Sequence, residues 1–87
     1  MKIKITIQEK NVTLSLEKEE NILSEKKWVD ENNLLEKFFP ALDEILDENN
    51  LKVIDLKDFT LETDVPKGYT TERIARTIVQ TFNFALE

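Results

Sequence analysis

Apolar and polar side chains alternate along the first third of the chain. Isoleucines occupy the odd positions of residues 2–7, and valine and leucine occupy the even positions of residues 12–17. A period of two is typical of a strand with one buried face. The polar residues 8–11 between the two runs predict a hairpin turn. After a second polar turn at 18–21, residues 22–29 alternate less well, and a third strand of the same meander is the simplest interpretation.

The period changes after Asp30. Apolar residues then recur at helical spacing and cover about 140° of arc at ~100° per residue. These residues are Leu34, Leu35, Phe38, Phe39, Leu42, Ile45 and Leu46. Asn33 followed by Glu36 resembles a capping box, and Asn49-Asn50 predicts the end of the helix. Pro40 lies inside the pattern and predicts a kink, because proline removes one backbone donor.

A second strand-and-helix pair completes the chain. Residues 51–58 predict a connection with one helical turn, and Phe59, Leu61 and Thr63 alternate with polar residues in a fourth strand. A parallel crossover strand fits best there. Residues 65–69 give the strongest loop signal, and Thr70 or Thr71 is predicted to cap a second helix. Its apolar stripe consists of Ile74, Ala75, Ile78, Val79, Phe82, Ala85 and Leu86.

The faces of the predicted strands decide the number of layers. One side carries only polar residues: Lys2, Lys4, Thr6, Thr13, Ser15, Glu17, Thr60, Glu62 and Asp64. A sheet covered on both faces needs apolar residues on both. We therefore expect a single α+β domain over residues 1–87 with two layers. In it, an antiparallel three-strand meander is extended by one parallel crossover strand, and two helices pack on one sheet face.

Composition excludes several classes of function. The 87 residues carry a net charge of −6, and the chain has neither Cys nor His. The negative charge repels phosphate backbones and anionic lipids, so we expect no direct nucleic acid partner and no membrane. Without Cys and His the commonest metal ligands and nucleophiles are missing, which predicts no metal, no cofactor, no catalytic residues and no enzyme. No apolar run resembles a signal peptide or a membrane span, so a cytoplasmic location is expected.

Two stretches carry a family resemblance. Residues 38–46, FFPALDEIL, place a proline inside the first helix, and residues 66–74, PKGYTTERI, open the second. With the element order, they resemble the N-terminal half of the TsaB (YeaZ) family. Its members typically have Leu-Leu-Pro in the first stretch and Gly-Pro-Gly-Ser-Phe-Thr-Gly-Leu-Arg in the second. The resemblance covers nearly the whole chain and implies a shortened lobe of the actin-like ATPase superfamily, with a ribonuclease-H-like sheet.

The positions that would serve nucleotide binding in that superfamily differ here. Residues 6–8, Thr-Ile-Gln, stand where the family has Asp-Thr-Ser, and the family's glycines are replaced at Val65, Lys67 and Thr71. A loop with Gly68 as its only glycine, and without an opposing lobe, cannot surround a triphosphate with backbone amides. We therefore expect no binding of ATP.

The second helix has an outer face with little charge. Between Ile74 and Leu86 the only charged residue is Arg76. Arg73, Thr77, Gln80 and Phe84 are spaced i, i+4, i+7 and i+11 and form a heptad-like seam. We interpret this face as a contact surface. The alternative is a helix that lies under the first helix and a loop, with Phe84 in a fraying last turn.

These observations lead to two hypotheses. As the resemblance implies, the chain is a non-catalytic subunit that binds a TsaD-like protein through its helical layer and supports tRNA threonylcarbamoyladenosine synthesis; a second copy, giving a homodimer through the helices, is the other candidate partner. The expected contact residues are Leu35, Phe39, Arg73, Arg76, Thr77, Gln80 and Phe84. The alternative is a regulatory domain that binds a small ligand or anion in the loop of residues 66–73, through Lys67, Gly68, Tyr69 and Thr70.

Two further features have simpler interpretations. The acidic residues between positions 43 and 58 match no calcium loop, so a solvated helix face is favoured over a cation site. Trp28, at the end of the third strand, is expected to cover the core or its edge rather than to hold a ligand.

Overall fold

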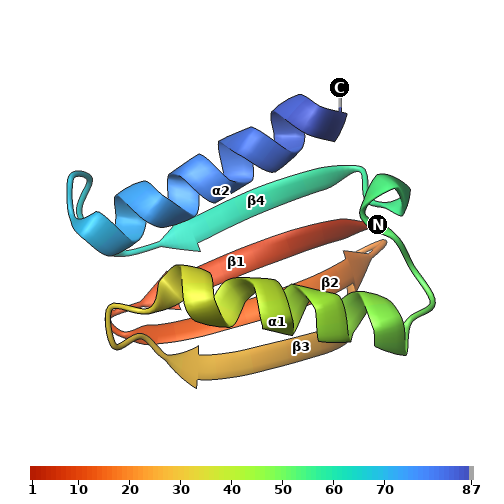
Figure 1. Cartoon of the computed structure of the whole chain (residues 1–87), viewed down its shortest axis with the longest axis horizontal. Coiled ribbons are helices and arrows are strands. Elements are labelled where there is room, and N and C mark those ends of the chain that lie inside the picture. The colour runs from red at the N-terminus through yellow and green to blue at the C-terminus, as the bar shows by residue number, and fades with distance from the viewer. Residues whose placement is uncertain (87) are drawn as a thin grey trace.

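The computed structural model describes residues 1–86, and Glu87, the last residue of the predicted domain, lies outside the described residues. The elements in chain order are β1 (Lys2–Gln8), β2 (Asn11–Lys18), β3 (Asn21–Val29), α1 (Leu34–Glu48), the 3-10 turn η1 (Val53–Asp55), β4 (Asp58–Thr63) and α2 (Thr70–Leu86). The sheet has the order β3-β2-β1-β4; β4 is parallel to β1, and the other pairs are antiparallel (Figure 1). The predicted α+β fold and element order are confirmed.

The core lies on one face of the sheet, between the strands and both helices. The alternating apolar residues of β1 and β2 are almost fully buried there, together with Phe59 of β4. In Figure 1, α1 crosses the sheet in front of β2 and β3, while α2 runs alongside β4. The opposite face carries ion pairs between neighbouring strands, such as Lys4 Nζ with Glu62 Oε2 at 2.6 Å. The predicted two-layer arrangement with one polar sheet face is therefore present.

A β-bulge explains the poor alternation in β3. Leu16 pairs with Ser24 but Glu17 pairs with Ile22, so Leu23 is an extra residue on β3. Beyond the bulge, the helix-facing positions hold Ser24, Lys26 and Trp28, which pair with buried residues of β2. This edge strand thus places two polar side chains under α1. A bulge inverts the apparent phase of a strand pattern, which is why the third run looked irregular.

The two ends of α1 are capped in different ways. At the C-terminus, Asn50 has a φ of 54°, and Leu51 N–H donates to Leu46 O (2.9 Å) while Asn50 N–H donates to Asp47 O (3.2 Å). This is a Schellman motif at the predicted stop. At the N-terminus the predicted capping box is wrong, because Asn33 Oδ1 accepts a hydrogen bond from Glu31 N–H (3.2 Å) instead. The helix runs through the exposed Pro40 as one element.

The start of α2 also departs from the prediction. Thr70 is its first helical residue, and Tyr69 O accepts the first helical hydrogen bond from Arg73 N–H (3.0 Å). Thr71 Oγ1 donates to Asp30 Oδ2 (2.9 Å), which ties the helix to the loop before α1. The predicted threonine cap is therefore replaced by a tertiary contact. Neither helix, within residues 1–86, is long and apolar enough to cross a bilayer.

Candidate functional site

An apolar groove of about 530 Å³ runs between α1 and α2. Helix α1 contributes Leu35 and Phe39, each 47% exposed. Helix α2 contributes the remaining lining residues: Thr70, Arg73, Ile74, Thr77, Ile78, Thr81 and Phe82. Arg73 is the only charged side chain in this lining, so the groove is suited to burying apolar groups rather than to acid–base chemistry.

Phe82 connects the α2 wall of the groove to the core. Its ring stacks on Phe59 with centroids 4.4 Å apart and an interplanar angle of 10°. It also lies 6.2 Å from the ring of Phe38 and 6.4 Å from that of Phe39. Because Phe38 and Phe59 are fully buried, Phe82 is fixed between α1 and the sheet. The groove therefore has a preformed aromatic surface, which reduces the ordering cost of binding.

The threonines make the α2 wall less polar than their sequence indicates. Thr77 Oγ1 donates to Arg73 O at 2.8 Å, one helical turn back. A hydroxyl satisfied by its own helix leaves the methyl group as the part available for contact. This local bond makes the Thr77 position of the groove wall less polar than its sequence indicates.

The structure divides the predicted contact residues into three groups. Leu35, Phe39, Arg73 and Thr77 line the groove together. Gln80 and Phe84 lie outside it on the exposed side of α2, and Phe84 is 77% exposed. Arg76 points elsewhere, with its Nη2 3.3 Å from Oε1 of the buried Glu72. The predicted contact residues other than Arg76 therefore lie in or beside the groove, and their role in binding stays a prediction.

Sequence analysis missed the residues that form the bottom and the far wall of the groove. Ile74, Ile78 and Phe82 belong to the apolar stripe that was expected to face the core, and Thr81 is not among the predicted contact residues. The apolar pattern of α2 carries no signal for them, because its stripe has the same spacing as that of α1.

The first turn of α2 already places a carboxylate next to the preceding loop. Gly68 has a φ of 98° and donates its N–H to Glu72 Oε1 at 3.4 Å. Glu72 is only 3% exposed, so its carboxylate occupies the N-terminal end of the helix. The neighbouring hollow of about 950 Å³ is lined by several further acids, among them Asp30 and Asp64. Both features disfavour an added anion at Lys67, Gly68, Tyr69 and Thr70.

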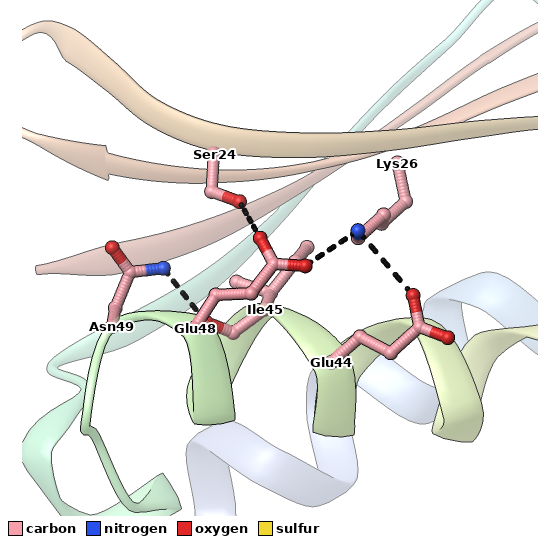
Figure 2. A network of polar contacts seen from close by, with 6 residues as sticks. All are labelled: Ser24, Lys26, Glu44, Ile45, Glu48 and Asn49. Atoms are coloured by element: carbon pink, nitrogen blue, oxygen red, sulfur yellow. Dashed lines mark hydrogen bonds and ion pairs between the residues drawn. The ribbon is translucent and has the colours of Figure 1, made fainter.

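The acidic face of α1 is exposed, but two of its carboxylates also bind β3. Lys26 Nζ lies 2.6 Å from Glu48 Oε1 and 3.3 Å from Glu44 Oε2, and Ser24 Oγ donates to Glu48 Oε2 at 3.3 Å (Figure 2). The hydrogen bond from Lys26 lowers the pKa of Glu48, and the reciprocal bond raises the pKa of Lys26. Within the described residues no cluster of three or more acidic side chains could hold a metal ion.

Comparisons with known proteins identify the fold. No family model matches the sequence, and no curated protein matches it. Two solved structures match over 99% of this chain, each with a TM-score of 0.76 and 22% sequence identity. One is YeaZ from Pseudomonas aeruginosa, and the other is described as an uncharacterized protein with similarity to peptidase YeaZ from the same organism.

The likeness to these structures is one of fold, and it is partial in length. This chain spans 40% of the length of each matching structure. The expected resemblance to a shortened TsaB (YeaZ) lobe is confirmed at the level of the fold. At this identity the match concerns the backbone, so the roles of the groove residues rest on their own geometry.

Proposed function

We propose that this chain is a non-catalytic interaction subunit whose groove between α1 and α2, with the neighbouring Phe84, binds a partner protein. The TsaB-like fold makes a TsaD-like subunit the first candidate, and the process served would then be the synthesis of threonylcarbamoyladenosine in tRNA. The observation that carries the proposal is the preformed apolar groove, in which Leu35 and Phe39 remain 47% exposed.

The partner segment that fits this groove is a helix with an apolar face. A groove between two helices accepts side chains spaced by one helical turn, as in other helix-in-groove contacts. Burying the exposed parts of Leu35, Phe39 and Phe84 would contribute about 25 cal/mol for each Å² of apolar surface removed from water. Phe84 stands beside the groove and would extend the contact along α2 toward its C-terminal end.

A second copy of the chain is the other partner with the required chemistry. In a two-fold contact the same surface is used twice, so Phe84 of one copy would meet the groove of the other. A homodimer and a complex with a TsaD-like subunit use the same residues. They differ in whether mass measurements on the chain alone reveal association.

The test compares Phe84→Asp with Ile54→Asp. Phe84 is 77% exposed and Ile54, in η1, is 82% exposed, so both substitutions introduce a carboxylate at a solvent-accessible apolar position. We expect Phe84→Asp to weaken binding to a TsaD-like subunit, or self-association, by about 2–4 kcal/mol, the scale of an interface hot spot. Ile54→Asp should change binding by less than about 0.5 kcal/mol.

Binding is measured by calorimetry with the TsaD-like subunit and by sedimentation for the chain alone. Equal losses in the two variants, or a loss only in Ile54→Asp, would contradict the assignment of the groove. Glu44→Lys is a poor control, because Glu44 is an ion-pair partner of Lys26 and the substitution would disturb the attachment of α1 to β3.

The proposal that the chain is not an enzyme has its own test. Gly68 is the only glycine in the loop before α2, and its N–H is already bonded to Glu72. We therefore expect no saturable binding of ATP with magnesium at about millimolar concentration, because few backbone amides are left to hold phosphate. Calorimetric saturation in the micromolar range would contradict this part of the proposal.

A further inference from the structure

A side-chain amide occupies one position on the outer edge of β4. Asn83 Oδ1 accepts the N–H of Phe59 at 2.8 Å, and Asn83 Nδ2 donates to the carbonyl of the same residue at 2.9 Å. Strand β4 is the last strand of the sheet, next to β1. A neighbouring strand would make this same pair of bonds to Phe59, one accepted and one donated. Asn83 therefore replaces one residue of a missing strand.

The other odd residues of β4 direct their backbone N–H and C=O groups outward, as Phe59 does. Backbone groups alternate along a strand, and Asp64 N–H donates inward to Ile7 O of β1 at 3.3 Å. The even residues of β4 thus turn toward β1, and the odd residues Phe59, Leu61 and Thr63 turn outward. An exposed row of outward N–H and C=O groups is a template for pairing with another strand.

Helix α2 brings Asn83 to this edge. Glu72, Arg76, Val79 and Asn83 are spaced i, i+4, i+7 and i+11, so they form one stripe of α2. This stripe is next to the groove stripe but distinct from it. Glu72 is buried and Val79 is packed against the core, which places the stripe on the sheet side. Asn83 is the residue of this stripe that hydrogen-bonds to the backbone of β4.

We propose that Asn83 is a latch that keeps the β4 edge closed, and that the edge, when the latch is removed, pairs in antiparallel fashion with β4 of a second copy of this chain. This inference is independent of the groove. Pairing also requires the C-terminal part of α2 to move away from the edge, which must break the stacking of Phe82 on Phe59 as well as both Asn83 bonds.

The sequence of β4 fits one antiparallel register. With Leu61 opposite Leu61 of the second copy, all outward residues face one another, and Phe59 lies opposite Thr63. On the polar sheet face, Thr60 then lies opposite Glu62, while Asp58 at the start of β4 lies opposite Asp64, so one pair of like charges meets at each end of the contact. While the latch is closed, both backbone groups of Phe59 are occupied in each copy, which leaves the central Leu61 pair as the main remaining contact.

The first experiment compares Asn83→Ala with Gln80→Ala, an exposed position of the same helix outside the stripe. Both are made in the Phe84→Asp background, so that association through the groove is suppressed. We expect the measured mass of the Asn83→Ala protein to double as its concentration rises, while the mass of the Gln80→Ala protein stays that of a monomer. The amide of Leu61 should exchange at least about tenfold more slowly in the associated Asn83→Ala protein, a factor equivalent to ~1.4 kcal/mol. A folded Asn83→Ala variant that keeps the mass and the Leu61 exchange rate of the control overturns the proposal.

A second substitution tests the register. Thr60→Glu places a carboxylate opposite Glu62 of the second copy, on the exposed sheet face, where it also stands near Lys4 of its own chain. Added to Asn83→Ala, it should abolish the doubling in mass. Persistent association in the double variant would exclude this pairing.

The unsubstituted chain provides a test that does not depend on the folding of any variant. If the latch is as described, the Phe59 amide is protected from exchange by Asn83, while the Leu61 amide exchanges at least about tenfold faster than that of Phe59. Equal protection of both amides in the monomer would mean that α2 already covers the whole edge, and the proposal would be wrong.

Discussion

The two helices have similar apolar patterns but are attached to the sheet in different ways. In α1 the buried residues are all apolar: Leu34, Phe38, Ala41, Leu42, Ile45 and Leu46. In α2 only Glu72, Ala75 and Ile78 are buried. Polar side chains fix α2 instead: Thr71 bonds to Asp30 near its start, and Asn83 bonds to Phe59 near its end.

This difference shows how a small domain can keep apolar surface available for binding. Apolar burial is non-directional, so it fixes the position of a helix less sharply than a hydrogen bond does. Hydrogen bonds fix position with little area. Because α2 is positioned at both ends by hydrogen bonds, Ile74 and Thr77 can remain in the wall of the groove.

The largest effect should come from the core of α1. Phe38 is fully buried, whereas its neighbour Phe39 is half exposed in the groove. We expect Phe38→Ala to lower the free energy of unfolding by about 3–5 kcal/mol, through lost burial and a cavity. Phe39→Ala should cost about 1 kcal/mol or less. Urea unfolding of the 87-residue chain by itself measures both values, and the unsubstituted chain should give one cooperative transition. Equal losses of unfolding free energy in the two variants would contradict the assignment of Phe38 to the core and Phe39 to the groove.

A smaller, local effect should follow from Asp30→Ala. Asp30 is buried, and its carboxylate accepts hydrogen bonds from Thr71 Oγ1 and from Asn33 N–H. Its removal leaves the partly buried hydroxyl of Thr71 without its acceptor, which should cost about 1 kcal/mol. Amide exchange should accelerate in the first turns of α2 while the middle of α1 keeps its protection. The exposed neighbour Glu31→Ala is the control, and an equal response of that variant would show that Asp30 does not hold α2.

The smallest effect should come from the ion pairs of α1. The hydrogen bond with Lys26 lowers the pKa of Glu48, so its contribution is present above the ordinary carboxyl pKa and is lost as the pH falls through the lowered value. The pKa of Lys26 is raised, so on the alkaline side the contribution is lost as the pH rises through that raised value. Lys26→Met should therefore lower the melting temperature slightly near neutral pH, and the difference should shrink as the pH falls through the lowered pKa of Glu48. The Lys4–Glu62 ion pair is present in both proteins, so its own dependence on pH cancels in the difference between their melting temperatures. A difference independent of pH would point to a packing effect of the substitution.

Local patterns were sufficient to predict most of the fold. The alternation in residues 2–17 defines strands with one buried face, and the Asn49-Asn50 pair marks the end of α1, because asparagine tolerates the left-handed conformation there. The polar positions on one side of three strands, β1, β2 and β4, predicted a single helical layer. Each of these signals depends on residues close together in the sequence.

The missed features depend on partners far apart in the sequence. Thr71 was assigned to a helix cap because threonine is common there, but its hydroxyl is used by Asp30. Lys26 falls at a helix-facing position only because a bulge at Leu23 shifts the register of β3. The groove forms because α1 and α2 cover different strands, and no periodicity within either helix reports the space between them.

The position of β1 in the middle of the sheet affects how the chain folds as it is synthesised. The first strand pairs with β2, which follows at once, but also with β4, where Ile3 meets Phe59. Local pairings close quickly, whereas a contact between distant residues must first overcome the entropy of the intervening loop. We therefore expect the meander and α1 to form an early intermediate, with one side of β1 unpaired until β4 leaves the ribosome. Helix α2, and with it the groove between α1 and α2, would form after the meander and α1.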